Sequence, residues 1–87
     1  MNKFIIEFLG TLVFIFVVLS TNNPLAIGGT LAFVIAVSQK ISYHNNFNPA
    51  STFAKTIAKK QPIEDFFFYI IIQMTAVLTA LKLYSIK

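Results

Sequence analysis

The hexapeptide Phe47-Asn48-Pro49-Ala50-Ser51-Thr52 contains the residues of this chain with the clearest capacity for hydrogen-bond chemistry. Asn is a preferred helix N-cap and Pro is favoured at the first helical position, so Asn48 is expected to open a short helix that ends near Lys59. Such a helix is about 16 Å long, which is half of a hydrocarbon core about 30 Å thick. If the end of this helix at Lys59 lies at the level of the lipid headgroups, Asn48 lies near the bilayer midplane. The alternative is that Asn48 simply caps an interfacial helix.

Two further polar residues, Glu7 and Gln73, stand inside apolar segments. A carboxylate within a spanning helix usually faces the protein interior and has a hydrogen-bond partner there. A second possibility stays open, because Glu7 is close enough to the start of its segment to reach the membrane interface. His44 is expected to form hydrogen bonds within a loop, and a position along a pore is the alternative.

The composition indicates an integral membrane protein. Of the 87 residues, 56% are hydrophobic and 11% are charged. The stretches 5–19 and 66–81 are too apolar for a soluble chain of this size. Without cysteine there is no thiol chemistry, and one His with three acidic residues makes no convincing metal site. We therefore expect no enzyme, no cofactor and no nucleic-acid partner, and the lipid bilayer as the surroundings.

The segments predict an all-α membrane protein with a single domain over residues 1–87. Transmembrane helices are expected at about 4–20, 24–43 and 64–84, and a re-entrant loop with a half-helix at about 44–59. Lys3 before the first apolar run also suits a signal peptide, but Glu7 interrupts that run and no small-residue cleavage site follows Leu19. The aromatic run 66–69 is expected to anchor the last helix at one membrane interface.

Small residues at helical spacing predict close helix packing. A small residue at every fourth position lets two membrane helices approach closely, although a mere tolerance for small residues is the alternative. The small positions are Gly10 in the first helix, Gly28, Ala32 and Ala36 in the second, and Ala76 and Ala80 in the last.

Three motifs, in order and over nearly the whole chain, resemble those of the aquaporin and glycerol-facilitator family. Glu7-Phe8-Leu9-Gly10-Thr11 resembles the E-x-x-G-T of an opening helix, and Phe47-Asn48-Pro49-Ala50 resembles the F-N-P-A loop. Tyr69-Ile70-Ile71-Ile72-Gln73, with Ala76 three residues beyond, resembles the Y-I-I-x-Q-x-x-G of the third helix. The resemblance implies that Glu7 and Gln73 hold the re-entrant loop while Asn48 directs its amide at a pore. The residues expected to line that pore are Gly28, His44, Asn48, Pro49, Ala50 and Ser51.

The chain also departs from the family pattern. A family member contains two such repeats in opposite orientation, whereas this chain contains one. An antiparallel homodimer would restore that arrangement, and such pores could assemble into the family's usual tetramer. Ser51 stands where the second repeat has an arginine, and Gly28 stands at the level of a bulky aromatic. The resemblance therefore implies a wide, neutral mouth that admits glycerol-sized solutes as well as water.

The lysines favour an alternative. With the N-terminus inside, five lysines lie on the cytoplasmic side and only Lys82 and Lys87 lie outside, so the positive-inside rule favours one orientation. A half-channel with one orientation would pair with a different, inverted partner, or would have a structural or regulatory role without a pore. A small proton-coupled exporter is a third class. It fits less well, because the chain has three spans and a re-entrant motif.

Overall fold

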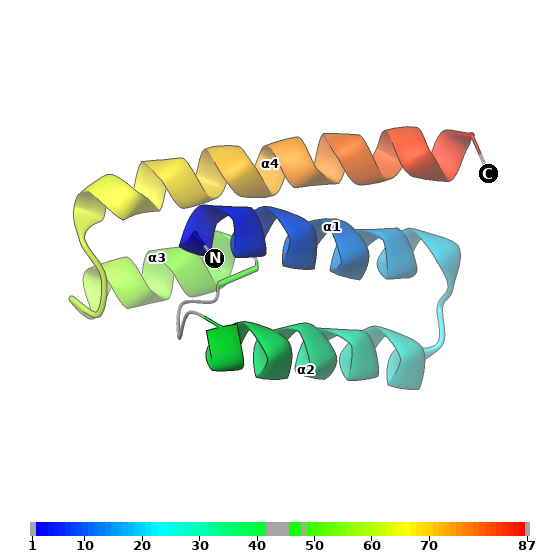
Figure 1. Ribbon diagram of the computed structural model, residues 1–87, viewed down its shortest axis with the longest axis horizontal. Helices are drawn as coiled ribbons and strands as arrows, with labels where there is room; N and C mark the ends of the chain where they lie inside the picture. The colour runs from blue at the N-terminus through cyan, green and yellow to red at the C-terminus, as the bar shows by residue number, and fades with distance from the viewer. Residues whose placement is uncertain (1, 42–45, 48, 87) are drawn as a thin grey trace.

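The computed structural model describes residues 2–41, 46, 47 and 49–86, and these residues form four α-helices (Figure 1). They are α1 (Lys3–Ser20), α2 (Pro24–Ile41), α3 (Pro49–Ile57) and α4 (Ile63–Ser85). With 18, 18 and 23 residues, α1, α2 and α4 are long and apolar enough to cross a membrane. The prediction of an all-α chain with three such helices is confirmed, and the chain is a multi-pass integral membrane protein.

The local sequence explains where the helices begin. The Asn2 side chain accepts a hydrogen bond from the backbone N–H of Phe4 at 2.7 Å and caps α1. Asn23 caps α2 in the same way, with Leu25 N–H at 2.8 Å, and Pro24 is the first helical residue. Both caps satisfy N–H groups that a helix start otherwise leaves unpaired. Glu64 and Asp65 lie in the first turn of α4, where the helix dipole favours negative charge.

The short helix α3 ends at Ile57, two residues before the expected position. Lys59 adopts a left-handed backbone with φ 63°. The Lys60 N–H donates to the Lys55 carbonyl at 2.8 Å, and the Lys59 N–H donates to the Thr56 carbonyl at 3.1 Å. This pair of bonds is a Schellman cap, which closes the helix and turns the chain towards α4.

The helix α1 lies between α4 and α2 (Figure 1). Among the described helices, α2 packs only against α1, and α3 packs against α4. α1 and α4 run in the same direction, and the Lys3 ammonium lies 2.6 Å from the Asp65 carboxylate, which joins their first turns. Their buried residues recur at helical spacing and form the core. These are Ile6, Glu7, Gly10 and Thr11 in α1, and Tyr69, Gln73, Ala76 and Ala80 in α4.

The aromatic run at the start of α4 divides between surface and core. Phe67 and Phe68 are 62% and 56% exposed, as expected of residues that face lipid or its interface. Tyr69 is only 1% exposed, and its ring centroid lies 5.2 Å from that of Phe4. The expectation of an interfacial anchor is therefore wrong for Tyr69, because its position on α4 faces α1.

A close contact joins α1 to the segment before α3. Phe47 is 2% exposed, and its ring lies directly over Gly10. A Cβ atom added to Gly10 would overlap ring carbons of Phe47, so a glycine is required there. A Cβ atom on Gly28 would have nothing within 4 Å.

The substitution Gly10→Ala is expected to lower the free energy of unfolding by about 1–3 kcal/mol, because overpacking must displace the Phe47 ring. The matched control is Gly28→Ala, which adds the same methyl group to open space in α2. Thermal unfolding of both variants in one detergent provides the comparison. Equal midpoints for Gly10→Ala and the unmodified chain would contradict the contact.

Candidate functional site at the start of the short helix

One buried carboxylate joins three parts of the chain. Glu7 in α1 is 0% exposed and accepts hydrogen bonds from the backbone N–H groups of Asn46, at 3.0 Å, and Phe47. The Gln73 Nε2 atom in α4 donates to the same carboxylate at 3.1 Å and to the Thr52 hydroxyl in α3 at 2.7 Å. Glu7 and Gln73 thus meet at the chain segment that leads into α3.

A second set of hydrogen bonds connects the two ends of α3. The Asn46 Nδ2 atom, before the helix, donates to the Gln61 Oε1 atom, after it, at 3.2 Å. The Gln61 Nε2 atom donates to the Thr52 carbonyl and to the Thr56 hydroxyl, both at 3.1 Å. The side chain of Gln61 therefore lies along α3 and ties its entry to its exit.

The backbone at Phe47 is unusual. Its φ of 65° lies in the left-handed region, which is uncommon for residues other than Gly, Asn and Asp. Such a conformation persists only where the surroundings impose it, and it occurs most often at functional sites. Here the imposing contacts are the bond from the Phe47 N–H to Glu7 and the packing of the ring on Gly10.

The start of α3 lies at the middle of α4. Thr52, in the first turn of α3, is bonded to Gln73, which is the eleventh residue of the 23-residue α4. At about 1.5 Å per residue, Gln73 is about 15 Å from the start of α4. If α4 crosses the bilayer, α3 therefore begins near the midplane, and the turn that follows its end at Ile57 contains the exposed Lys59 and Lys60.

The chemistry available at this site is hydrogen bonding. Three donors occupy the Glu7 carboxylate, which is shielded from the surface, so it serves as a structural acceptor. In the described part of the chain, three buried polar atoms lack a hydrogen-bond partner, namely Thr11 Oγ1, Asn46 Oδ1 and Gln73 Oε1. The two amide oxygens can each accept a hydrogen bond, and the Thr11 hydroxyl can donate or accept one.

Four of the other residues expected at a pore are exposed or partly exposed on the described chain, and two are not among the described residues. Pro49 and Ala50 are exposed at the start of α3, Ser51 is partly exposed, and Gly28 is exposed on α2. Asn48 and His44 fall outside the described residues, so their predicted roles stay predictions.

The small residues of the two later helices have different surroundings. Ala76 and Ala80 of α4 are 0% exposed and belong to the core. Gly28, Ala32 and Ala36 of α2 are all exposed. No described helix covers this face of α2.

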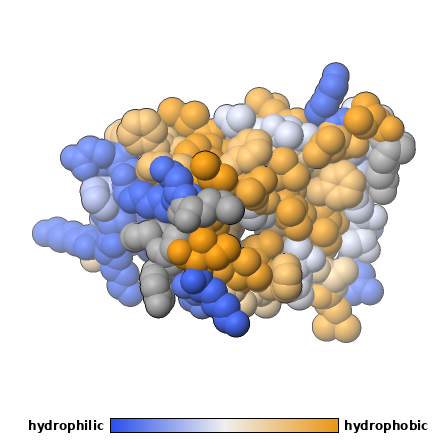
Figure 2. Space-filling model, viewed as in Figure 1, coloured by the Kyte–Doolittle hydropathy of each residue, from blue (hydrophilic) through white to orange (hydrophobic). Residues whose placement is uncertain are grey.

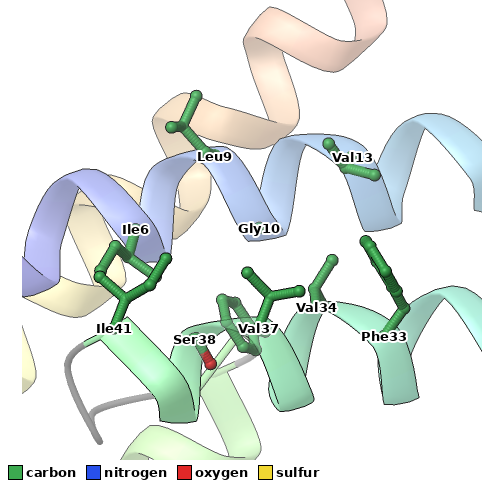
Figure 3. Close-up of a pocket in the computed structure, with 10 residues that line it drawn as sticks. Ile6, Leu9, Gly10, Val13, Phe33, Val34, Val37, Ser38 and Ile41 are labelled. Carbon is green, nitrogen blue, oxygen red and sulfur yellow. The ribbon is translucent and has the colours of Figure 1, made fainter. Parts of the chain in front are cut away.

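An apolar hollow of about 190 Å³ lies between α1 and α2 (Figure 3). Gly10 of α1 lines it on one side, and Phe33, Val34 and Ser38 of α2 line it on the other (Figure 3). Phe47 also belongs to its lining. Among its described lining residues, only Ser38 has a side-chain oxygen, and this hydroxyl donates to the Ile35 carbonyl at 2.9 Å.

Three participants had no role in the sequence-based prediction, namely Asn46, Gln61 and Thr52, although Thr52 belongs to the hexapeptide singled out above. Thr52 lies three residues after Pro49 on α3, and this spacing could have suggested a side chain on the inner face. Gln61 lies in a surface turn between two lysines and a proline, where a polar residue is ordinary. No feature of the sequence indicates that Gln61 takes part in the site.

No protein-family model, curated protein or solved structure matches this chain.

The substitution Glu7→Gln is expected to destabilise the chain by about 1–3 kcal/mol, because one acceptor oxygen becomes an NH₂ group and leaves a buried N–H donor unpaired. Glu64→Gln is the control, since it makes the same chemical change at an exposed position. The measurement is the midpoint of thermal unfolding in detergent, monitored by the loss of helix content. Loss of stability of the same size in both variants would show that Glu7 does not hold the segment.

Proposed function

We propose that this chain is a half-channel of the aquaporin and glycerol-facilitator type, and that two antiparallel copies form a pore for water and small uncharged solutes. The observation that supports this proposal best is the position of α3. A nine-residue helix cannot span a bilayer, and its start is fixed at the middle of α4 by Glu7, Gln73 and Thr52. Irregular backbone at such depth is tolerated where it is enclosed by protein or lines a water-filled cavity.

Antiparallel pairing would place two α3 helices with their N-termini facing each other at the midplane. Each helix N-terminus has about half a positive charge, which disfavours cations and protons in a narrow pore. In this arrangement Asn48 of each copy donates hydrogen bonds to the oxygen atoms of passing solutes. Ser51, Gly28 and His44 are proposed to line the mouths.

The packing of a single chain is consistent with a requirement for a second copy. α2 has only two buried residues, Val34 and Ser38, and one neighbouring helix in the described chain. Its face of small residues remains open, and small residues at helix interfaces allow close approach in membranes. A pore between two copies would use surfaces of this kind. We propose further that such pores could assemble into tetramers, as in the family that the motifs resemble.

The surroundings of Glu7 argue against the proton-coupled exporter. A carboxylate that exchanges protons with a substrate path must be reached from that path. Glu7 is 0% exposed and its oxygens accept bonds from Asn46, Phe47 and Gln73. We therefore propose a passive channel and no enzymatic activity.

Proteoliposomes that contain the chain are expected to shrink faster in a hyperosmotic gradient than liposomes of the same lipids without protein. They are also expected to take up glycerol, because Gly28 leaves the proposed mouth without a bulky side chain. Stopped-flow light scattering measures both rates. Water permeability equal to that of empty liposomes, at verified incorporation, would exclude the channel.

The variant Gly28→Phe should lower the glycerol rate more than the water rate, because it restores bulk at the proposed mouth. Gly29→Phe is the matched control, since Gly29 is equally open and is turned by about 100° around α2. The selectivity proposal fails if the unmodified chain passes water but excludes glycerol. It also fails if Gly28→Phe leaves glycerol uptake unchanged.

A half-channel with a single orientation is the second candidate, and the distribution of charge favours it. Hydrophilic residues gather at the end of the molecule where α3 ends and α4 begins (Figure 2). The lysines of the helices and turns at that end are Lys3, Lys40, Lys55, Lys59 and Lys60, whereas Lys82 lies in the last turn of α4. By the positive-inside rule, this asymmetry favours one orientation and hence a different, inverted partner.

Labelling decides between the two candidates. The chain has no cysteine, so a single Lys60→Cys or Ser85→Cys variant offers one thiol at a chosen end. The homodimer predicts that an impermeant thiol reagent modifies a fraction of each variant in intact cells. Modification of only one variant would exclude the antiparallel homodimer and leave the hetero-pairing half-channel.

A further inference from the structure

The turn between α3 and α4 combines exposed positive charge with exposed apolar side chains. We define the basic turn as Ile57, Lys59, Lys60 and Ile63. Ile57 is 66% exposed and Ile63 is 64% exposed, and both lysines between them are exposed. In the described part of the chain the two lysines take part in no ion pair. The nearby Asp65 is engaged by Lys3 at 2.6 Å.

The backbone of the basic turn is fixed by hydrogen bonds rather than by its side chains. The Lys59 and Lys60 N–H groups are both used in the Schellman cap of α3. The turn is thus held by backbone groups, while the two ammonium groups take part in no ion pair among the described residues. Lys40, in the last turn of α2, adds exposed positive charge at the same end of the molecule.

We propose that the basic turn binds the phosphate groups of anionic phospholipids in the leaflet that it faces. Exposed isoleucines on either side of two lysines suit the boundary between acyl chains and headgroups, because long lysine side chains reach from an apolar level to the phosphates. Lysines at such a boundary are attracted by anionic lipid, and the attraction falls off within a Debye length. Glu64, exposed at the start of α4, reduces this positive field without cancelling it.

This contact also reaches the start of α3. Gln61 directly follows Lys60 and accepts a hydrogen bond from Asn46 at 3.2 Å, while its Nε2 atom donates to the Thr52 carbonyl at 3.1 Å. A lipid that immobilises Lys59 and Lys60 therefore restricts Gln61, and through it the segment that Glu7 holds. Anionic lipid acts as a ligand that stabilises the position of α3. This inference does not depend on the proposed channel activity.

The test is thermal unfolding of the purified chain in a mild neutral detergent, titrated with phosphatidylglycerol or with phosphatidylcholine of the same acyl chains. Phosphatidylglycerol is expected to raise the midpoint more than phosphatidylcholine, and high salt is expected to abolish the difference. The double variant Lys59→Gln/Lys60→Gln should weaken the apparent affinity for phosphatidylglycerol by about fivefold for each lysine, since each contributes about 1 kcal/mol at an anionic surface.

Two further variants make the outcome decisive. Lys82→Gln removes the same charge from an exposed position at the opposite end and should leave the effect unchanged. Lys59→Arg/Lys60→Arg retains the charge and should retain the effect. The proposal is overturned if Lys82→Gln weakens binding as much as the double variant, or if phosphatidylcholine stabilises equally. Equal stabilisation by inorganic phosphate would assign the basic turn to a soluble anion instead of a lipid.

Discussion

The carboxylate of Glu7 is the group on which the arrangement of this chain depends. Backbone N–H groups in the interior of a membrane protein find no water, so those of Asn46 and Phe47 need an acceptor from the protein. Glu7 supplies it, since its two oxygens accept hydrogen bonds from both N–H groups. Gln73 completes the arrangement from α4 and fixes Thr52 at the same level. These hydrogen bonds from Gln73 fix the start of α3 halfway along α4.

Much of the fold could be predicted because membrane helices have strong signals. Long apolar runs, the Asn23-Pro24 start of α2 and the acidic start of α4 predict three spans whose observed ends lie close to the expected ones. The sequence left Glu7 two positions, the protein interior or the membrane interface, whereas the family resemblance implied that Glu7 and Gln73 both hold the loop. The structure buries both, at 0% and 1% exposure.

The surroundings of individual residues were harder to predict, because they depend on which helices become neighbours. Tyr69 resembles an interface residue in the sequence, yet its place on α4 turns it towards α1. Gly28 and Ala32 share the spacing of a packing face, but spacing says that a close approach is possible and does not say with which helix. The left-handed backbone of Phe47 has no signal in the sequence, since it is imposed by Glu7 and Gly10 from α1.

The long separation between Glu7 and its partners has a consequence for biosynthesis. The donors follow Glu7 by 39, 40 and 66 residues along the chain. At about 5–20 residues per second, a ribosome needs about 3–13 s to extend the chain from Glu7 to Gln73. During that interval the Glu7 carboxylate lacks its hydrogen-bond partners. Because Glu7 lies in the second turn of α1, its side chain can stay in the headgroup region until those partners have been made. The hydrogen bonds that hold the start of α3 can therefore be completed only after α4 has been made.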